Sequence, residues 1–201
     1  LVSFITCSLT PLEFKGMDLD IILKCARNGI PLHACSLPGA GATAPITVPG
    51  VVLLSAAEIL AMLAVAQAVQ PGIPVIATPL IFSTDMMTGR SLQSSAESMQ
   101  GAALAVQFIK AAFGIPTHTY GIGSDSPLSD GQCMSEGALR SMLIGLSGAF
   151  LPALLAACPA LTCALLSSDF VRGVLLLTLR DGLQYWLPRV LAPHGLPVRV
   201  S

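Results

Sequence analysis

The stretch "GIPVIATP" at residues 72–79 is one of three similar segments, the others being "GIPLHACS" at 29–36 and "GIPTHTYG" at 114–121. Their starts lie 43 and 42 residues apart, and a related "GLPVRVS" begins at residue 195. Glycine readily ends a helix in the left-handed conformation, and proline suits the first residue of a strand. Each copy therefore predicts a helix that stops at the glycine and a strand that starts just after the proline.

Helical patterns precede the glycines, and the opening "LVSFITCS" at residues 1–8 is typical of one more strand. The predicted helices, with Asp18 and Ser94 or Ser95 as candidate N-caps, cover residues 18–28, 51–69, 95–112 and 133–148. Alternating strands and helices indicate a parallel sheet with right-handed crossovers. The fold class is therefore α/β, with an incomplete (β/α)8 TIM barrel, or a fragment of one, as the prediction and an open doubly wound sheet as the alternative. A dinucleotide fold has no support, because no Gly-x-Gly-x-x-Gly motif opens a helix.

The repeat also predicts which strand residues share a face, because side chains alternate along a strand. Two residues after the prolines lie His33, Ile76 and His118, and four residues after them lie Cys35, Thr78 and Tyr120. These mostly polar residues are expected in the barrel interior, with the second set nearer the mouth where barrel enzymes carry their sites. The two histidines fit either a site or a satisfied core, and both interpretations stay open.

Composition limits the function. Net charge is -1, which argues against nucleic-acid binding. Only 10% of residues are charged and the mean hydropathy is +0.76, so a membrane-associated protein is an alternative. Charge-free runs cover residues 59–84 and 141–168, although prolines interrupt both. Six cysteines without a Cys-x-x-Cys pair suggest reduced thiols and a cytoplasmic location. No metal-ligand spacing is present.

The loops after the expected strands, residues 37–50, 80–91 and 121–132, carry the unusual sequence. Long loops in compact domains are often functional. Candidate pocket residues in the last two loops are Phe82, Asp85, Arg90, Asp125, Asp130 and Gln132. Asp130 fits a helix cap as well as it fits a site. Carboxylates with aromatic rings at a barrel mouth suit a small cationic substrate.

These loops resemble the trimethylamine methyltransferase family. The similar segments are Gly-Ala-Thr-Ala-Pro at 41–45, Asp-Met-Met-Thr-Gly at 85–89, and Asp-Ser, three residues on, Asp-x-Gln at 125–132. The resemblance covers residues 1–149, expected to form a βα-repeat barrel portion, and fades in a divergent segment, residues 150–201. Family chains are more than twice this length, and Leu1 lies within an expected strand, so the chain is expected to be a middle portion.

The resemblance implies a (β/α)8 barrel that transfers a methyl group from a methylated amine, trimethylamine or a quaternary amine such as glycine betaine, to Co(I). It implies that the corrinoid is carried by a partner protein and that no cofactor is bound directly. Carried over by motif and register, Asp85, Asp125 and His118 are the candidate catalytic residues. The candidate substrate-binding residues are Phe82, Tyr120, Asp130, Gln132 and Thr43. An inactive barrel fragment is the alternative, and a homo-oligomer is left open.

Overall fold

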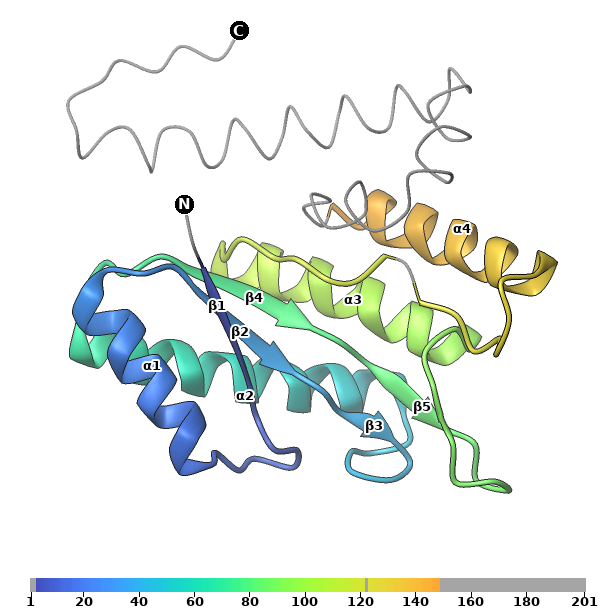
Figure 1. Cartoon of the computed structure of the whole chain (residues 1–201), viewed down its shortest axis with the longest axis horizontal. Coiled ribbons are helices and arrows are strands. Elements are labelled where there is room, and N and C mark those ends of the chain that lie inside the picture. Colours follow the sequence, from blue (N-terminus) through green and yellow to red (C-terminus); the bar gives the residue numbers. More distant parts are fainter. Residues whose placement is uncertain (1–2, 122, 149–201) are drawn as a thin grey trace, which may run out of the picture.

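The computed structural model describes residues 3–121 and 123–148 and shows a mixed α/β arrangement (Figure 1). The strands are β1 (Phe4–Cys7), β2 (Leu32–Ser36), β3 (Gly39–Ala40), β4 (Val75–Pro79), β5 (Phe82–Thr84) and β6 (Ser91–Leu92). The helices are α1 (Gly16–Asn28), α2 (Val48–Val69), α3 (Ala96–Phe113) and α4 (Gly131–Leu146). All four predicted helices are confirmed; the C-terminal ends of α1 and α2 fall at the expected residues, and the other six ends differ by one to three residues. The predicted fourth helix, 133–148, is α4.

The main sheet is parallel, as predicted, with the strand order β1-β2-β4. Its register pairs Ile5 with His33 and Ile76 in one row, and Cys7 with Cys35 and Thr78 in the next. The rows derived from the Gly-Ile-Pro repeat are therefore confirmed for β2 and β4. A second small sheet, β3-β5-β6, lies within the loops after β2 and β4, and no sequence pattern predicted it.

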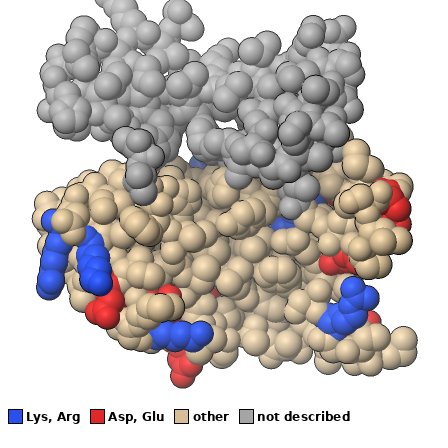
Figure 2. All heavy atoms as spheres, viewed as in Figure 1, with Lys and Arg blue, Asp and Glu red and all other residues tan. Residues whose placement is uncertain are grey.

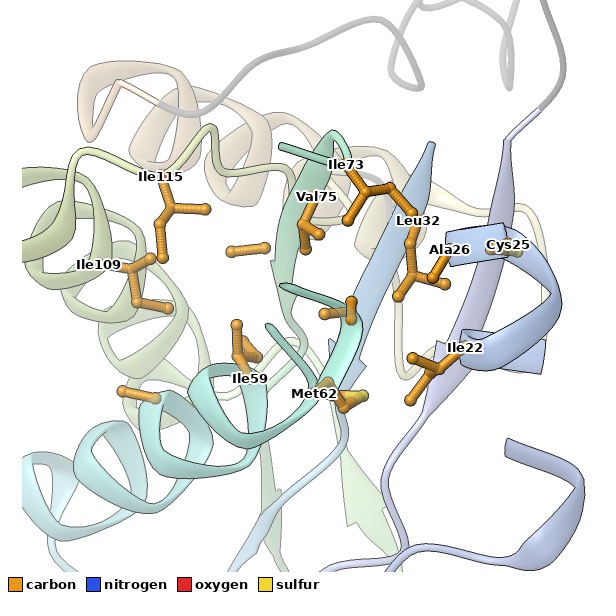
Figure 3. Close-up of a cluster of buried hydrophobic side chains, with 14 residues drawn as sticks. Ile22, Cys25, Ala26, Leu32, Ile59, Met62, Ile73, Val75, Ile109 and Ile115 are labelled. Carbon is orange, nitrogen blue, oxygen red and sulfur yellow. The ribbon is translucent and has the colours of Figure 1, made fainter. Parts of the chain in front are cut away.

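The hydrophobic core lies between the main sheet and helices α1, α2 and α3. Figure 3 shows Ile22 of α1, Leu32 of β2, Ile59 of α2 and Ile109 of α3 converging in one cluster, and all four are fully buried. Alternate strand residues that face this cluster, such as Ala34 and Ala77, are small, which lets the helices pack closely. The opposite face of the sheet therefore carries the two rows that include His33 and Cys35 of β2.

Helix α2 is long and apolar enough to cross a membrane by length and composition alone, and it is the one described helix that meets this test. A core helix of a soluble protein passes the same test, and Ile59 and Met62 place α2 in the core. The apolar run 59–84 is wrong as a single span, because it is divided among α2, β4 and β5. The run 141–168 lies mostly outside the described residues.

Glycine ends two helices as the repeat predicts. Gly29 after α1 and Gly114 after α3 both adopt the left-handed conformation, with φ of 65° and 63°. Ser95 is confirmed as the N-cap of α3 because its hydroxyl accepts the Ser98 N–H at 3.1 Å. Asp18 is wrong as an N-cap, because α1 begins earlier, at Gly16, and the buried Asp18 carboxylate instead accepts the Thr6 hydroxyl at 3.2 Å.

The expected strand after the third Gly-Ile-Pro copy is reduced to a single bridge between Ala77 and Thr117. The Ala77 N–H donates to the Pro116 carbonyl and the His118 N–H donates to the Ala77 carbonyl, each at 2.8 Å. The next parallel bond would need an N–H at Pro79, which proline lacks. The Thr119 hydroxyl binds the Pro79 carbonyl at 2.6 Å instead, so residues 117–120 still follow the edge of β4.

Charged side chains are sparse on the face of the molecule shown in Figure 2. Most of its visible described surface belongs to uncharged residues, and the Lys, Arg, Asp and Glu side chains gather near its edges. The 10% share of charged residues in the sequence agrees with this sparseness. A charge-selective site on this face therefore depends on a few particular side chains rather than on a broad field.

Candidate functional site

A groove of about 340 Å³ lies on the sheet face opposite the core, at the carboxyl ends of the parallel strands. It is open rather than enclosed, and its lining is Ile5, Cys7, Cys35, Leu37, Leu80, Gln93 and Tyr120. Parallel α/β sheets carry their ligand sites at this end of the strands. The lining is mostly apolar, with two thiols, one amide and one phenol as its polar groups.

Three aromatic rings lie in a row beside the groove. The His33 and His118 rings meet edge to face with centroids 5.8 Å apart, and the His118 and Tyr120 rings do so at 5.5 Å. The Thr78 hydroxyl lies 3.5 Å from Nδ1 of His33. His118 is buried, whereas Tyr120 is 38% exposed, so the row runs from the sheet interior to the groove rim.

Burial favours the neutral form of both histidines. Burial, followed by the charge of His33, lowers the pKa of His118 to about 4. Burial also lowers the pKa of His33 below its ordinary value. The Nδ1 atom of His118 is buried and has no hydrogen-bond partner among residues 3–121 and 123–148. The row therefore presents neutral rings, which do not repel a cationic ligand.

The backbone on the far side of the groove is held by Asp125 and Arg140. The two carboxylate oxygens of Asp125 accept the N–H groups of Gln93 at 2.8 Å and Ser94 at 2.7 Å. Arg140 is fully buried, and its Nε donates to the Tyr120 carbonyl at 2.8 Å while its Nη1 donates to the Gln93 carbonyl. Gln93 and Tyr120 both line the groove. These two charged residues thus position groove residues through their backbone.

The remaining predicted site residues lie outside the groove lining. Asp85 closes the β5–β6 turn, where the Thr88 hydroxyl and then the Met87 N–H bind its carboxylate and lower its pKa. Phe82 is half-buried in β5, and Thr43 accepts the Gly39 N–H at 3.0 Å in the loop after β3.

Two more predicted residues lie at the start of α4. Asp130 is the N-cap, accepting the Cys133 N–H at 2.9 Å and the Ser126 hydroxyl at 3.0 Å, and these bonds lower its pKa. Gln132 is exposed and donates to Glu136 at 2.7 Å. Of the eight predicted site residues, the structure brings His118 and Tyr120 together at the groove and places Asp125 behind it. A catalytic or substrate-binding role stays a prediction for all eight.

Substitution of Asp130 separates its capping role from a substrate role. We expect Asp130→Ala to lower the midpoint of thermal unfolding by about 2–4 °C, since it removes the acceptor for the first turn of α4. Asp130→Ser keeps a capping oxygen but no charge, and it should restore most of the midpoint, which circular dichroism measures. A serine variant that is stable but binds a cationic ligand more weakly would show that the carboxylate also serves the site.

Sequence reasoning missed Glu58 and the role of Arg140. Glu58 is fully buried on α2 and accepts hydrogen bonds from the hydroxyls of Ser8, Thr10 and Ser36 and from the Leu12 N–H. The available signal was a lone charge within an otherwise apolar helical segment, which a buried and fully bonded carboxylate explains. Arg140 gave the same kind of signal at the start of the apolar run 141–168.

Comparison with known proteins gives a consistent result. A family model described as trimethylamine methyltransferase (MTTB) matches residues 2–167. The trimethylamine methyltransferase MttB of Methanosarcina barkeri (strain Fusaro / DSM 804) is 29% identical over 147 residues, covering 73% of this chain and 30% of the relative. A glycine betaine methyltransferase of Desulfitobacterium hafniense (strain Y51) is 32% identical over 148 residues, covering 74% and 30%. The chain thus spans about 30% of the length of these relatives.

Proposed function

The chain belongs to the trimethylamine methyltransferase family, and from this premise we propose that its groove binds a methylated amine and helps to move a methyl group to a corrinoid protein. We take the parallel strands β1, β2 and β4, followed by residues 117–120, as consecutive parts of a (β/α)8 barrel. In such a barrel the groove lies at the mouth, where a partner protein has access.

The observation that carries this proposal is the row of neutral rings that ends at the groove rim. The exposed ring of Tyr120 offers a π face to an ammonium group, and the low pKa of His118 keeps a positive charge away from it. Among the described residues, Ile5, Leu37 and Leu80 give the groove a largely apolar lining, which suits N-methyl groups. Among the residues that the structure describes, no Asp or Glu lines the groove. In this proposal the cation is therefore bound by the faces of the aromatic rings.

A quaternary amine such as glycine betaine is the substrate that we favour. One relative, the glycine betaine methyltransferase of Desulfitobacterium hafniense, shares 32% identity with this chain over 148 residues. A quaternary nitrogen leaves as a neutral amine once a methyl group is removed, whereas a tertiary amine needs further activation. Trimethylamine is the second candidate, because other relatives are trimethylamine methyltransferases.

The corrinoid of the partner would supply a Co(I) nucleophile for the methyl group. The chain's own contribution is to hold the ammonium group so that one methyl points out of the groove, which is catalysis by positioning. The open groove and the exposed Tyr120 at its rim fit an acceptor that approaches from outside. Because the chain spans about 30% of its relatives, a catalytically inactive portion that binds the amine without turnover is the second candidate.

Tyr120→Ala tests the proposal most directly. We expect it to weaken glycine betaine binding about tenfold, as the loss of one cation–π contact predicts, whereas Tyr120→Phe keeps the ring and should bind nearly as the wild type does. Isothermal titration calorimetry measures the affinity. The second measurement is the visible absorbance of a Co(I) corrinoid protein mixed with the chain and the amine.

Three outcomes separate the candidates. Binding together with amine-dependent methylation of the corrinoid supports the enzyme, and binding without methylation supports the inactive portion. Equal affinities for the wild type and Tyr120→Ala would overturn the assignment of the groove. A neutral isostere of glycine betaine, in which carbon replaces the nitrogen, is the matched ligand control and should bind more weakly than the cation.

A further inference from the structure

We propose that Cys7 and Cys35 form a reactive dithiol site on the floor of the groove, which small-molecule disulfides oxidise to an intramolecular disulfide. Both residues line the groove, and they are register partners on the neighbouring strands β1 and β2. The site is a property of these two thiols and does not rest on methyl transfer. The described cysteines are all free thiols.

Strand geometry brings the two side chains together. Cys7 and Cys35 are directly paired in a parallel ladder, so both side chains leave the sheet on the same face. Neighbouring strands lie about 4.8 Å apart, which falls within the roughly 4.4–6.8 Å between Cα atoms that disulfides span. A bond between the two sulfurs therefore needs side-chain rotation and little backbone movement.

The environments of the two thiols differ in a way that assigns their roles. Cys7 is half-buried at the groove, whereas Cys35 is 1% exposed. A hydrogen bond from the Cys35 thiol lowers the pKa of Cys7 to about 7, against the opposing effects of burial and Asp18. The same hydrogen bond, then burial, then the charges of Cys7 and Glu58 raise the pKa of Cys35. Cys7 is thus the attacking thiolate and Cys35 the resolving thiol.

The oxidation is two exchange steps with a disulfide such as oxidised glutathione. The Cys7 thiolate attacks one sulfur, breaks the glutathione S–S bond and releases one glutathione thiolate, which leaves a mixed disulfide on Cys7. Cys35 then loses its proton to water and attacks the Cys7 sulfur. The second glutathione thiolate leaves and takes a proton. Two electrons pass from the protein to the oxidised glutathione, which ends as two thiols.

The other described cysteines lack this arrangement. Cys25 is buried in α1 among apolar core residues, where burial raises its pKa. Cys133 lies in the first turn of α4, away from the strands. Neither is a register partner of a second cysteine, so they serve as internal references for the reaction.

The experiment uses the whole chain and oxidised glutathione as the probe. After incubation and an acid quench, free thiols are blocked with N-ethylmaleimide, and tryptic peptides are identified without reduction. Cleavage at Lys15, Lys24, Arg27 and Arg90 separates Cys7 in peptide 1–15 from Cys35 in peptide 28–90 and leaves Cys25 in peptide 25–27. We expect to find peptides 1–15 and 28–90 joined by one disulfide. Treatment with dithiothreitol should separate them again.

Three variants make the test decisive. Cys35→Ser should stop at a mixed disulfide on Cys7, Cys7→Ser should leave Cys35 unmodified, and Cys25→Ser should form the cross-link as the wild type does. In the wild type, Cys7 should also react with iodoacetamide about tenfold faster than Cys25 at pH 7.5, an advantage lost in denaturant. Three results in the wild type would overturn the proposal. They are the blocking of both Cys7 and Cys35 by maleimide, a lasting mixed disulfide on Cys7, and a disulfide between Cys7 and a cysteine other than Cys35.

Discussion

Replacing Glu58 with alanine is expected to lower the free energy of unfolding by about 3–5 kcal/mol, because it leaves several buried donors without an acceptor. One carboxylate oxygen, Oε2, accepts the hydroxyls of Ser8 and Ser36 at 2.6 Å each and of Thr10 at 3.0 Å. The other, Oε1, accepts the Leu12 N–H at 2.9 Å. Glu58 thereby joins α2 to the segment after β1 and to the carboxyl end of β2. The groove lies at this same end of the strands.

Glu58→Gln and Glu97→Ala make the comparison informative. Glutamine keeps the size and one acceptor oxygen, so it should lose about half as much stability as alanine does, roughly 2 kcal/mol. Glu97 is an exposed glutamate in the first turn of α3, and its removal should change stability much less. Urea unfolding of the three variants, followed by circular dichroism, gives the free energies. Equal losses for Glu58→Ala and Glu97→Ala would show that the four hydrogen bonds do not stabilise the fold.

The parts of the fold that sequence predicted are those that local chemistry controls. The Gly-Ile-Pro copies place Gly29 and Gly114 at helix ends and put Pro31 and Pro74 just before strands, so the register of β2 and β4 follows. That register is what brought Cys35 and Thr78 to one row. The third copy failed as a strand because Pro79, on the neighbouring strand, has no N–H to continue the ladder. Such a failure depends on pairing between segments and cannot be seen within one segment.

The candidate site was harder to predict, because a carboxylate in a loop serves either a ligand or the backbone. The loop positions of Asp85, Asp125 and Asp130 predict site residues, but in the structure each carboxylate accepts hydrogen bonds from N–H or hydroxyl groups of its own chain. Short polar residues at helix starts and turns have this alternative in general. The buried charges Glu58 and Arg140 were missed because the partners that justify their burial lie 20 or more residues away in sequence.

Replacing Arg140 with methionine is expected both to destabilise the fold and to disturb the groove. Methionine fills a similar volume but leaves the Tyr120 and Gln93 carbonyls without their donors, which should cost about 2–4 kcal/mol for two partly buried acceptors. Burial, only partly offset by the charge of Asp125, lowers the pKa of Arg140 to about 10, so the guanidinium is charged at neutral pH. The bonds from it are charge-assisted and therefore stronger than neutral ones.

Arg140→Lys separates the effect of the positive charge from that of the guanidinium fork, meaning the two donor nitrogens Nε and Nη1 that bind two carbonyls at once. Lysine keeps a positive charge but has one nitrogen, which cannot donate to both carbonyls with the geometry of Nε and Nη1. If the fork positions the groove, the lysine and methionine variants should both bind glycine betaine several-fold more weakly, although lysine loses less stability. The exposed Arg27 in the last turn of α1, replaced by methionine, is the matched control and should change both the stability and the affinity much less. Stability lost without any change in affinity would mean that Arg140 supports the α4 packing alone, and that Tyr120 and Gln93 keep their places through Asp125 and the strand edge.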